Sequence, residues 1–307
     1  MTVSFTVLDG GLSTALEIVG ADISGPLWTA RTVVEEPEML EEAHRLFVNA
    51  GAEIVTSASY QCGWREFSML GLDDREARRA VTSTITIARR ATAGTSARVA
   101  ASIGPFGAVL ANGSEYTGRY GVDWSRVTAH HRERIEVLID AGADMFAVET
   151  IPLSEEGRLI GEILDDFGAP PAWFSFGVAN PDPTGLPTVR TYGGDSISAA
   201  IVGVKGYRNL VAVGVNCSHP DVIDRALEAI SEVDESAPRI VYPNHGRHWD
   251  AVARAWTGDE FDAFTDEQVR GWVSKGAACI GGCCGVGPEK ISHLASLAST
   301  GPGDLAR

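Results

Sequence analysis

Eight short runs rich in Val, Ile, Phe and Ala recur along this chain of 307 residues, separated by segments with helical spacing. Several runs lack the polar alternation of a half-exposed strand, as is typical of parallel strands covered on both faces. Eight strands alternating with about eight helices over some 290 residues is the rhythm of a (β/α)8 barrel. We therefore predict an α/β fold, a single (β/α)8 TIM barrel, with strands over residues 3–8, 54–59, 99–103, 145–150, 172–178, 211–217, 239–244 and 279–283.

Helix signals fall between these runs. Pro37 stands where a first helical residue is expected and Gly51 where that helix would end, while Asp73 and Glu76 form a capping-box pattern. Further helix starts are predicted at Asp123, Ser154, Asp195, His219 or Asp221, Thr265 and Gly287. The glycines that join a helix to the next strand, which we expect in the left-handed conformation, are Gly51, Gly142 and Gly276.

The pattern is that of one domain. The alternative, a doubly wound open sheet, lacks a GxGxxG motif after the first strand and a natural point at which to divide the chain. We predict one barrel domain over residues 1–300 and a short C-terminal tail over residues 301–307. Four segments that follow strands are long and would crowd the C-terminal rim, where barrel active sites lie: residues 10–36, 105–122, 179–194 and 245–264.

Charge and composition narrow the choice of partner. The formal net charge is −16, and the sequence has no Lys- or Arg-rich patch that would attract nucleic acid or an anionic membrane surface. The acidity suits a cationic small molecule, although solubility alone also explains it. We find neither the basic and apolar stretches of a signal peptide nor an apolar run long enough to span a membrane. With five cysteines, an odd and sparse number, we expect reduced thiols and a cytoplasmic protein.

Two adjacent cysteines, Cys283 and Cys284, end the last predicted strand, and Cys217 ends the sixth. Three thiolates at one rim could hold Zn²⁺ and leave its fourth tetrahedral position open, which is the arrangement of a catalytic zinc. The glycines at 281, 282 and 285 suit closely spaced ligands, because residues with a Cβ resist such conformations. The alternatives are cysteines that act as small apolar side chains, and a strained disulfide between neighbours. Histidine ligands, which we favour less, would come from His219, His245 or His248.

Two carboxylates, Asp9 and Glu149, end the first and fourth predicted strands after apolar runs. Carboxylates placed so deep need a cationic partner. That partner could be an Arg or Lys of another strand, or the ammonium group of an amino-acid ligand. A general acid and base pair, as in glycoside hydrolysis, is a third interpretation that the cysteines make less attractive.

With these residues in hand, the sequence resembles the homocysteine S-methyltransferase family, most closely its short members that use S-methylmethionine or S-adenosylmethionine. The similarity covers nearly the whole chain and is most specific in the paired NC and GGCC motifs. The motifs that carry it are LDGG at residues 8–11, TSASYQ at 56–61, GSEY at 113–116, VET at 148–150, GVNC at 214–217, VYPN at 241–244 and GGCC at 281–284.

The resemblance implies a Zn²⁺ site whose fourth position takes the sulfur of homocysteine. The residues that it makes zinc ligands, and catalytic through the activated thiolate, are Cys217, Cys283 and Cys284. Those that it assigns to the substrate are Asp9 and Glu149 for the ammonium, Ser57 with the backbone at Gly10 and Gly11 for the carboxylate, and Asn216 for orienting the site.

The expected reaction moves a methyl group from a sulfonium donor to the thiol of L-homocysteine and gives methionine. Family members that use betaine are longer, and multidomain methionine synthases carry folate and cobalamin modules, so we do not expect methylcobalamin as the donor. The rival interpretations are a betaine-type or other thiol methyltransferase, a zinc hydrolase, and a non-catalytic homocysteine- or zinc-binding protein. We expect a monomer or homodimer.

Other residues near the predicted rim have less definite roles. Aromatic side chains that could face a sulfonium, or simply pack, are Trp28, Tyr60, Tyr116 and Trp249. Of the remaining cysteines, we expect Cys62 near the pocket, where it could react with alkylating agents, and Cys279 in the core.

Overall fold

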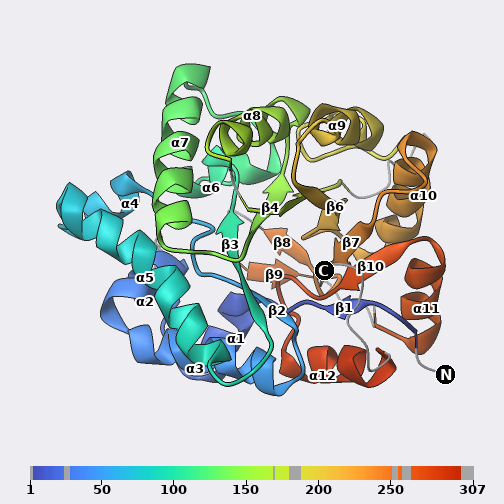
Figure 1. Ribbon diagram of the computed structural model, residues 1–307, viewed down its shortest axis with the longest axis horizontal. Helices are drawn as coiled ribbons and strands as arrows, with labels where there is room; N and C mark the ends of the chain where they lie inside the picture. Colours follow the sequence, from blue (N-terminus) through green and yellow to red (C-terminus); the bar gives the residue numbers. More distant parts are fainter. Residues whose placement is uncertain are drawn as a thin grey trace.

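The computed structural model describes residues 3–23, 28–168, 170–179, 188–250, 255–257 and 264–298. Within them, eight parallel strands form one sheet in the order β1-β10-β7-β6-β5-β4-β3-β2, ringed by helices (Figure 1). These strands are β1 (Thr6–Val7), β2 (Ile54–Thr56), β3 (Arg98–Ile103), β4 (Met145–Ile151), β5 (Ala172–Phe176), β6 (Leu210–Asn216), β7 (Arg239–Tyr242) and β10 (Ala277–Ile280).

The sheet closes on itself between β1 and β2. Leu8 forms an isolated parallel bridge with Ile54, and the backbone N–H of Asp9 donates to the Ile54 carbonyl at 3.1 Å. On the other side, the N–H of Leu8 donates to the Ile280 carbonyl at 2.9 Å, so β1 lies between β2 and β10. The predicted (β/α)8 barrel is confirmed.

Alternate strand residues point into the barrel or out toward the helices. The interior is filled by buried side chains from every strand, among them Leu8, Ile54, Trp173, Ile240 and Cys279. The prediction that Cys279 belongs to the core is therefore confirmed. Because the interior is packed, the space for a ligand lies at the rim.

The outer helices begin and end largely where the sequence predicts. The capping box between Asp73 and Glu76 is present, with N···O distances of 2.8 and 2.9 Å. Gly51, Gly142 and Gly276 all have positive φ, as expected of residues that follow a helix. The helices are α3 (Pro37–Asn49), α5 (Asp74–Thr92), α7 (Trp124–Asp140), α8 (Ser154–Asp166), α9 (Ile197–Val204), α10 (Ile223–Val233), α11 (Asp266–Ser274) and α12 (Pro288–Leu297).

Three predicted helix starts differ in detail. Ser154 is the first residue of α8 rather than its cap, because its N–H and hydroxyl both donate to the Asp195 carboxylate, at 2.8 and 2.5 Å. Asp195 is thereby engaged, and Ser196 caps α9 instead. Asp123 occupies the N-cap position of α7, but its side chain makes no capping hydrogen bond.

The long segments after the strands contain short elements that the sequence analysis did not anticipate. The one after β1 holds two helices, the one after β3 a helix and a 3-10 turn, and the one after β7 a two-stranded hairpin. No helix in the described part of the chain is long and apolar enough to cross a membrane. The short elements of these segments are α1 (Leu12–Ile18), α2 (Trp28–Glu35), α6 (Phe106–Leu110), η1 (Ser114–Tyr116), β8 (His248–Asp250) and β9 (Ala255–Thr257). Helix α4 (Trp64–Met69) follows β2, and η2 (Pro220–Val222) begins after His219, one of the predicted helix starts.

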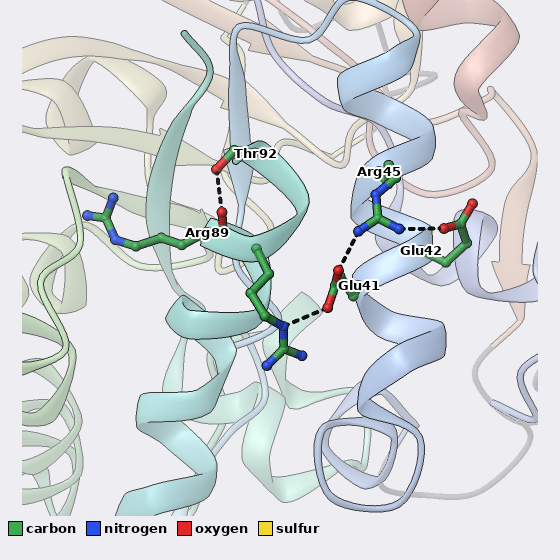
Figure 2. Close-up of polar contacts among 6 residues, drawn as sticks. Glu41, Glu42, Arg45, Arg89 and Thr92 are labelled. Atoms are coloured by element: carbon green, nitrogen blue, oxygen red, sulfur yellow. Dashed lines mark hydrogen bonds and ion pairs between the residues drawn. The ribbon is translucent and has the colours of Figure 1, made fainter. Parts of the chain in front are cut away.

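An ion-pair network joins α3 to α5 on the outside of the barrel (Figure 2). Glu41 accepts hydrogen bonds from Arg45 on its own helix and from the Nε of Arg90 on α5, the latter at 2.6 Å. Arg45 also contacts Glu42 at 2.9 Å. Pairs this exposed add little stability, so packing of the apolar helix faces carries most of the α3–α5 contact.

Strands β6 and β7 pair closely at Gly214, and a substitution there tests this packing. A Cβ on Gly214 would lie 1.8 Å from the Ile240 carbonyl oxygen, whereas a Cβ on Gly271, within α11, would meet nothing within 4 Å. We expect Gly214→Ala to destabilise the protein by about 3 kcal/mol or more. Gly271→Ala, the matched control, should stabilise it by up to about 1 kcal/mol, since alanine favours helix over glycine. Urea unfolding measures both, and equal stabilities would contradict this packing.

Candidate metal centre and substrate pocket

Three cysteine sulfurs meet at the C-terminal rim of the barrel. Cys217 directly follows β6, and Cys283 and Cys284 follow β10; both strands pair with β7, which lies between them. The Sγ of Cys284 lies 3.9 Å from the Sγ of Cys217 and 3.9 Å from the Sγ of Cys283. All three sulfur atoms lie within 4.8 Å of one another. The structure thus brings together the three predicted ligands.

The spacing fits one tetrahedral ion. Four ligands at the usual Zn–S distance of about 2.3 Å lie about 3.8 Å apart along each edge of the tetrahedron. The measured separations of 3.9 Å match that edge closely. Among the described side chains, these three cysteines are the group able to hold a metal ion, and thiolate donors suit zinc.

Local backbone geometry holds the sulfurs in place. Cys217 has a positive φ of 48°, and its carbonyl accepts a hydrogen bond from the Tyr192 hydroxyl at 2.7 Å. Gly285 has a φ of 78°, and a Cβ there would lie 2.2 Å from the His245 ring. A Cβ on Gly282 would lie 2.1 Å from Val286. The glycines around the cysteine pair are therefore required both by conformation and by close packing.

A pocket opens beside the sulfurs, with an empty volume of about 820 Å³ including solvent at its mouth. That space is within the range of small-molecule sites, and no Lys, Arg or His is among the described residues that line it. Its lining residues are Asp9, Gly10, Gly11, Leu12, Ser13, Thr29, Thr56, Ser57, Ala58, Tyr60, Ser102, Glu115, Tyr116, Glu149, Thr150, Cys217, Tyr242, Gly282, Cys283 and Cys284.

Asp9 and Glu149 are buried in this pocket, 2% and 8% exposed. The Asp9 carboxylate accepts hydrogen bonds from the N–H and hydroxyl of Thr56, at 2.7 and 3.0 Å, and the Glu149 carboxylate accepts one from the Ser102 hydroxyl. Burial raises the pKa of Asp9 well above its ordinary value and that of Glu149 to about 7. Neither forms an ion pair with an Arg or Lys in the described chain, so the predicted alternative of a protein cation is not observed.

The remaining predicted residues divide between the pocket wall and the layer behind it. Gly10, Gly11 and Ser57 line the pocket. Asn216 is fully buried behind the wall, where its amide receives a hydrogen bond from the Thr150 N–H and donates one to the Thr150 hydroxyl, both at 2.7 Å. Asn216 therefore positions Thr150, which has a φ of 58°, rather than contacting a ligand in the pocket.

Aromatic side chains form part of the wall. Tyr60 and Tyr116 line the pocket, and the ring of Tyr116 packs edge-on against Tyr192 at 5.3 Å. The buried Arg134 holds the Tyr60 backbone by donating to its carbonyl at 3.0 Å. The side chains of Trp28 and Trp249 lie outside the described residues.

Several residues of the pocket wall were not among those predicted from the sequence. Tyr242 receives a hydrogen bond from the indole of Trp173 at 3.0 Å and lies 2.5 Å from the Ser175 hydroxyl, so it connects the barrel interior to the pocket. The signal for Tyr242 was available, because it alternates with Ile240 and is the last residue of β7. Ser102 could have been found in the same way near the end of β3.

The other candidate ligands and cysteines are not part of the three-sulfur group in the described chain, although His245 lies beside it and its backbone N–H donates to the Cys284 carbonyl at 3.0 Å. His219 caps η2, and the ring of His245 packs against Gly285, while the side chain of His248 is outside the described residues. Cys62 is fully buried and donates to the Ala58 carbonyl at 3.2 Å, one layer behind the pocket wall.

Three cysteine sulfurs able to hold a metal ion thus lie beside two buried carboxylates in one pocket at the rim of a (β/α)8 barrel. Residues 6–298 match the family described as Homocysteine S-methyltransferase, and the chain belongs to that family.

Individual relatives are similar to this chain over nearly their full lengths. The chain is 35% identical to the homocysteine S-methyltransferase YbgG of Bacillus subtilis (strain 168), over 97% of this chain and 95% of the relative. It is 35% identical to the homocysteine S-methyltransferase of Escherichia coli (strain K12), over 94% and 93%. The crystal structure of the metallated form of the homocysteine methyltransferase MmuM from Escherichia coli superposes with a TM-score of 0.81 at 32% identity, covering 96% of both chains.

Burial of Glu149 predicts a pH-dependent stability. The pKa of this carboxyl is raised from 4.5 to about 7 in the folded protein, so its contribution to stability falls as pH rises through that window. Glu149→Gln keeps the shape and removes the charge. Without ligand, this variant should be more stable than the wild type at pH 8 by on the order of 1–3 kcal/mol, with a smaller difference at pH 5.

Urea unfolding at the two pH values measures this difference. Glu155→Gln, on the exposed side of α8, is the matched control and should change little at either pH. A Glu149→Gln variant less stable than the wild type at pH 8 would contradict the electrostatic assignment.

Proposed function

We propose that the protein transfers a methyl group from a sulfonium donor, S-methylmethionine or S-adenosylmethionine, to the thiol of L-homocysteine, giving methionine. The metal in this proposal is Zn²⁺, held by Cys217, Cys283 and Cys284. The observation that carries it is the meeting, in one pocket, of three sulfurs at tetrahedral spacing and two buried carboxylates without a protein cation in the described chain. The names of the Escherichia coli and Bacillus subtilis relatives support the same activity.

The acidic pair would bind the ammonium of homocysteine. The charge of Glu149 acts on Asp9, so the two carboxyls face a shared space in which an ammonium would offset both. The hydroxyl of Ser57 and the backbone at Gly10 would receive the substrate carboxylate. The N–H of Gly11 already donates to the Val286 carbonyl at 3.0 Å. Gly11 would therefore let the substrate approach the backbone closely and would not donate a hydrogen bond to it.

Placed this way, the substrate thiol reaches the cysteine cluster. Bound there, Zn²⁺ would keep the homocysteine sulfur deprotonated at neutral pH, where a free thiol with a pKa of about 8.5 is mostly protonated. Three protein thiolates more than offset the charge of a divalent ion, so the substrate sulfur keeps much of its nucleophilicity.

The transfer itself makes few demands on the protein. The substrate sulfur attacks the methyl carbon as the bond from that carbon to the sulfonium sulfur breaks, and the donor leaves as a neutral thioether. No proton moves in this step, so the pocket needs to align the two substrates and needs no general base. Tyr60 and Tyr116 would offer aromatic faces to the sulfonium.

The proposal includes the cellular compartment in which the protein acts. The five cysteines are free thiols, and a site built from three of them works only where thiols stay reduced, as in the cytoplasm. The sequence predicts a monomer or a homodimer, and this prediction is part of the proposal.

Cys217→Ser tests the proposed metal site together with the activity. The variant should lose most bound zinc and at least about 100-fold in methionine formation, because one ligand of the site is removed. Cys62→Ser is the matched control, since a serine hydroxyl can also donate to the Ala58 carbonyl. Zinc content would be measured by elemental analysis, and methionine formation with S-methylmethionine, S-adenosylmethionine and betaine in parallel.

Turnover by the wild type with a sulfonium donor, lost in Cys217→Ser and kept in Cys62→Ser, is the expected result. Bound zinc and homocysteine without turnover of any donor would instead favour a binding protein. Undiminished turnover by Cys217→Ser would contradict the three-thiolate site.

A further inference from the structure

The pocket contains a third acidic side chain, Glu115, for which the homocysteine site has no use. Glu115 lies in η1, on the segment after β3, and lines the same pocket as Asp9 and Glu149. Its Oε2 atom is buried and has no hydrogen-bond partner in the described chain, and no ion pair engages it there. Burying a carboxylate oxygen in that position costs free energy unless a ligand supplies a hydrogen-bond donor.

The backbone around Glu115 is fixed, so its carboxylate is held at the pocket by the fold. A Cβ on Gly107 of α6 would lie 2.4 Å from the Glu115 backbone nitrogen, which shows how closely η1 packs on α6. The N–H of Gly118 donates to the Ser114 carbonyl at 2.8 Å and closes the turn that carries Glu115. Burial raises the pKa of the Glu115 carboxyl, in keeping with a group that lacks a protein cation.

Glu115 stands with the aromatic part of the wall. Glu115 directly precedes Tyr116 in η1, and both residues line the pocket together with Tyr60. The pocket thus holds a third carboxylate, next to Tyr116, in addition to Asp9 and Glu149. Methyl transfer between two amino acids brings two ammonium groups into one pocket, and the acidic pair accounts for only one of them.

We infer that Glu115 binds the α-ammonium of the methyl donor and makes the protein select a sulfonium that is itself an amino acid. This inference rests on the proposed function. The sulfonium has no N–H to donate and suits the faces of Tyr60 and Tyr116, whereas an ammonium supplies the hydrogen-bond donors that Oε2 lacks. Glu115 is thus a residue that determines donor specificity, and it takes no part in bond making.

The test compares two sulfonium donors that differ only in the ammonium group: S-methylmethionine and its des-amino analogue, 4-(dimethylsulfonio)butanoate. In the zinc-loaded wild type, kcat/KM should favour S-methylmethionine. Glu115→Gln keeps the size and removes the charge, and should shrink that preference about 10- to 100-fold, the loss expected for one charge-assisted hydrogen bond. The KM for homocysteine should move by less than about threefold in the same variant.

Two further variants sharpen the comparison. Glu115→Asp keeps the charge on a shorter side chain and should recover part of the preference, which a merely structural role of Glu115 would not predict. Glu155→Gln, on α8 and away from the pocket, should retain the wild-type preference.

The outcomes separate the inference from the proposed function. Equal losses with both donors, or a rise confined to the KM for homocysteine, would overturn the role of Glu115 while leaving the methyltransferase proposal intact. If the wild type turned over neither sulfonium, the proposed function would fail. Calorimetric titration of S-methylmethionine into wild type and Glu115→Gln would then decide the inference: about 10-fold weaker binding by the variant supports it, and equal binding overturns it.

Discussion

Three cysteine sulfur atoms, two pairs of which are 3.9 Å apart, cannot all be thiolates without a cation, and the rim of this barrel is arranged around that constraint. Two unit negative charges at this distance repel by about 4 kcal/mol at an effective dielectric constant of 20. In the absence of a metal, hydrogen bonds from Cys217 and Cys283 hold the pKa of Cys284 well below its ordinary value, while hydrogen bonds with Cys217 and Cys284 raise the pKa of Cys283. The cluster therefore favours one thiolate until a divalent ion stabilises all three.

The fold accepts backbone strain to build this site. Within the described residues, Thr150 and Cys217 are two of the three non-glycine residues with positive φ, and they follow Glu149 and Asn216 at the ends of β4 and β6. Such conformations cost about 1–3 kcal/mol each and persist when surrounding contacts hold them. The Asn216 amide accepts a hydrogen bond from the Thr150 N–H and donates one to the Thr150 hydroxyl, so the residue after Glu149 is joined to the residue before Cys217.

Sequence reasoning succeeded where chain periodicity decides the outcome. Apolar runs and helix caps predicted the barrel, because parallel strands buried on both faces are compatible with few folds. Cys217 and Cys283 were predicted to lie on one rim because both stand at strand ends. The hydrogen bonds that join Asn216 to Thr150 and the helices within the long rim segments were not predictable, since both depend on contacts between distant parts of the chain. The exposure and partners of Glu115 likewise appear only once η1 packs on α6.

In the proposed site, three cysteines bind a metal and leave one position for the substrate sulfur. X-ray absorption at the zinc edge, recorded on zinc-loaded protein with and without homocysteine, tests this most directly. We expect three sulfur ligands near 2.3 Å and one lighter atom without homocysteine, changing to four sulfur ligands when homocysteine is added. A first shell that contains histidine nitrogen, or one that does not gain sulfur when homocysteine binds, would contradict the claim.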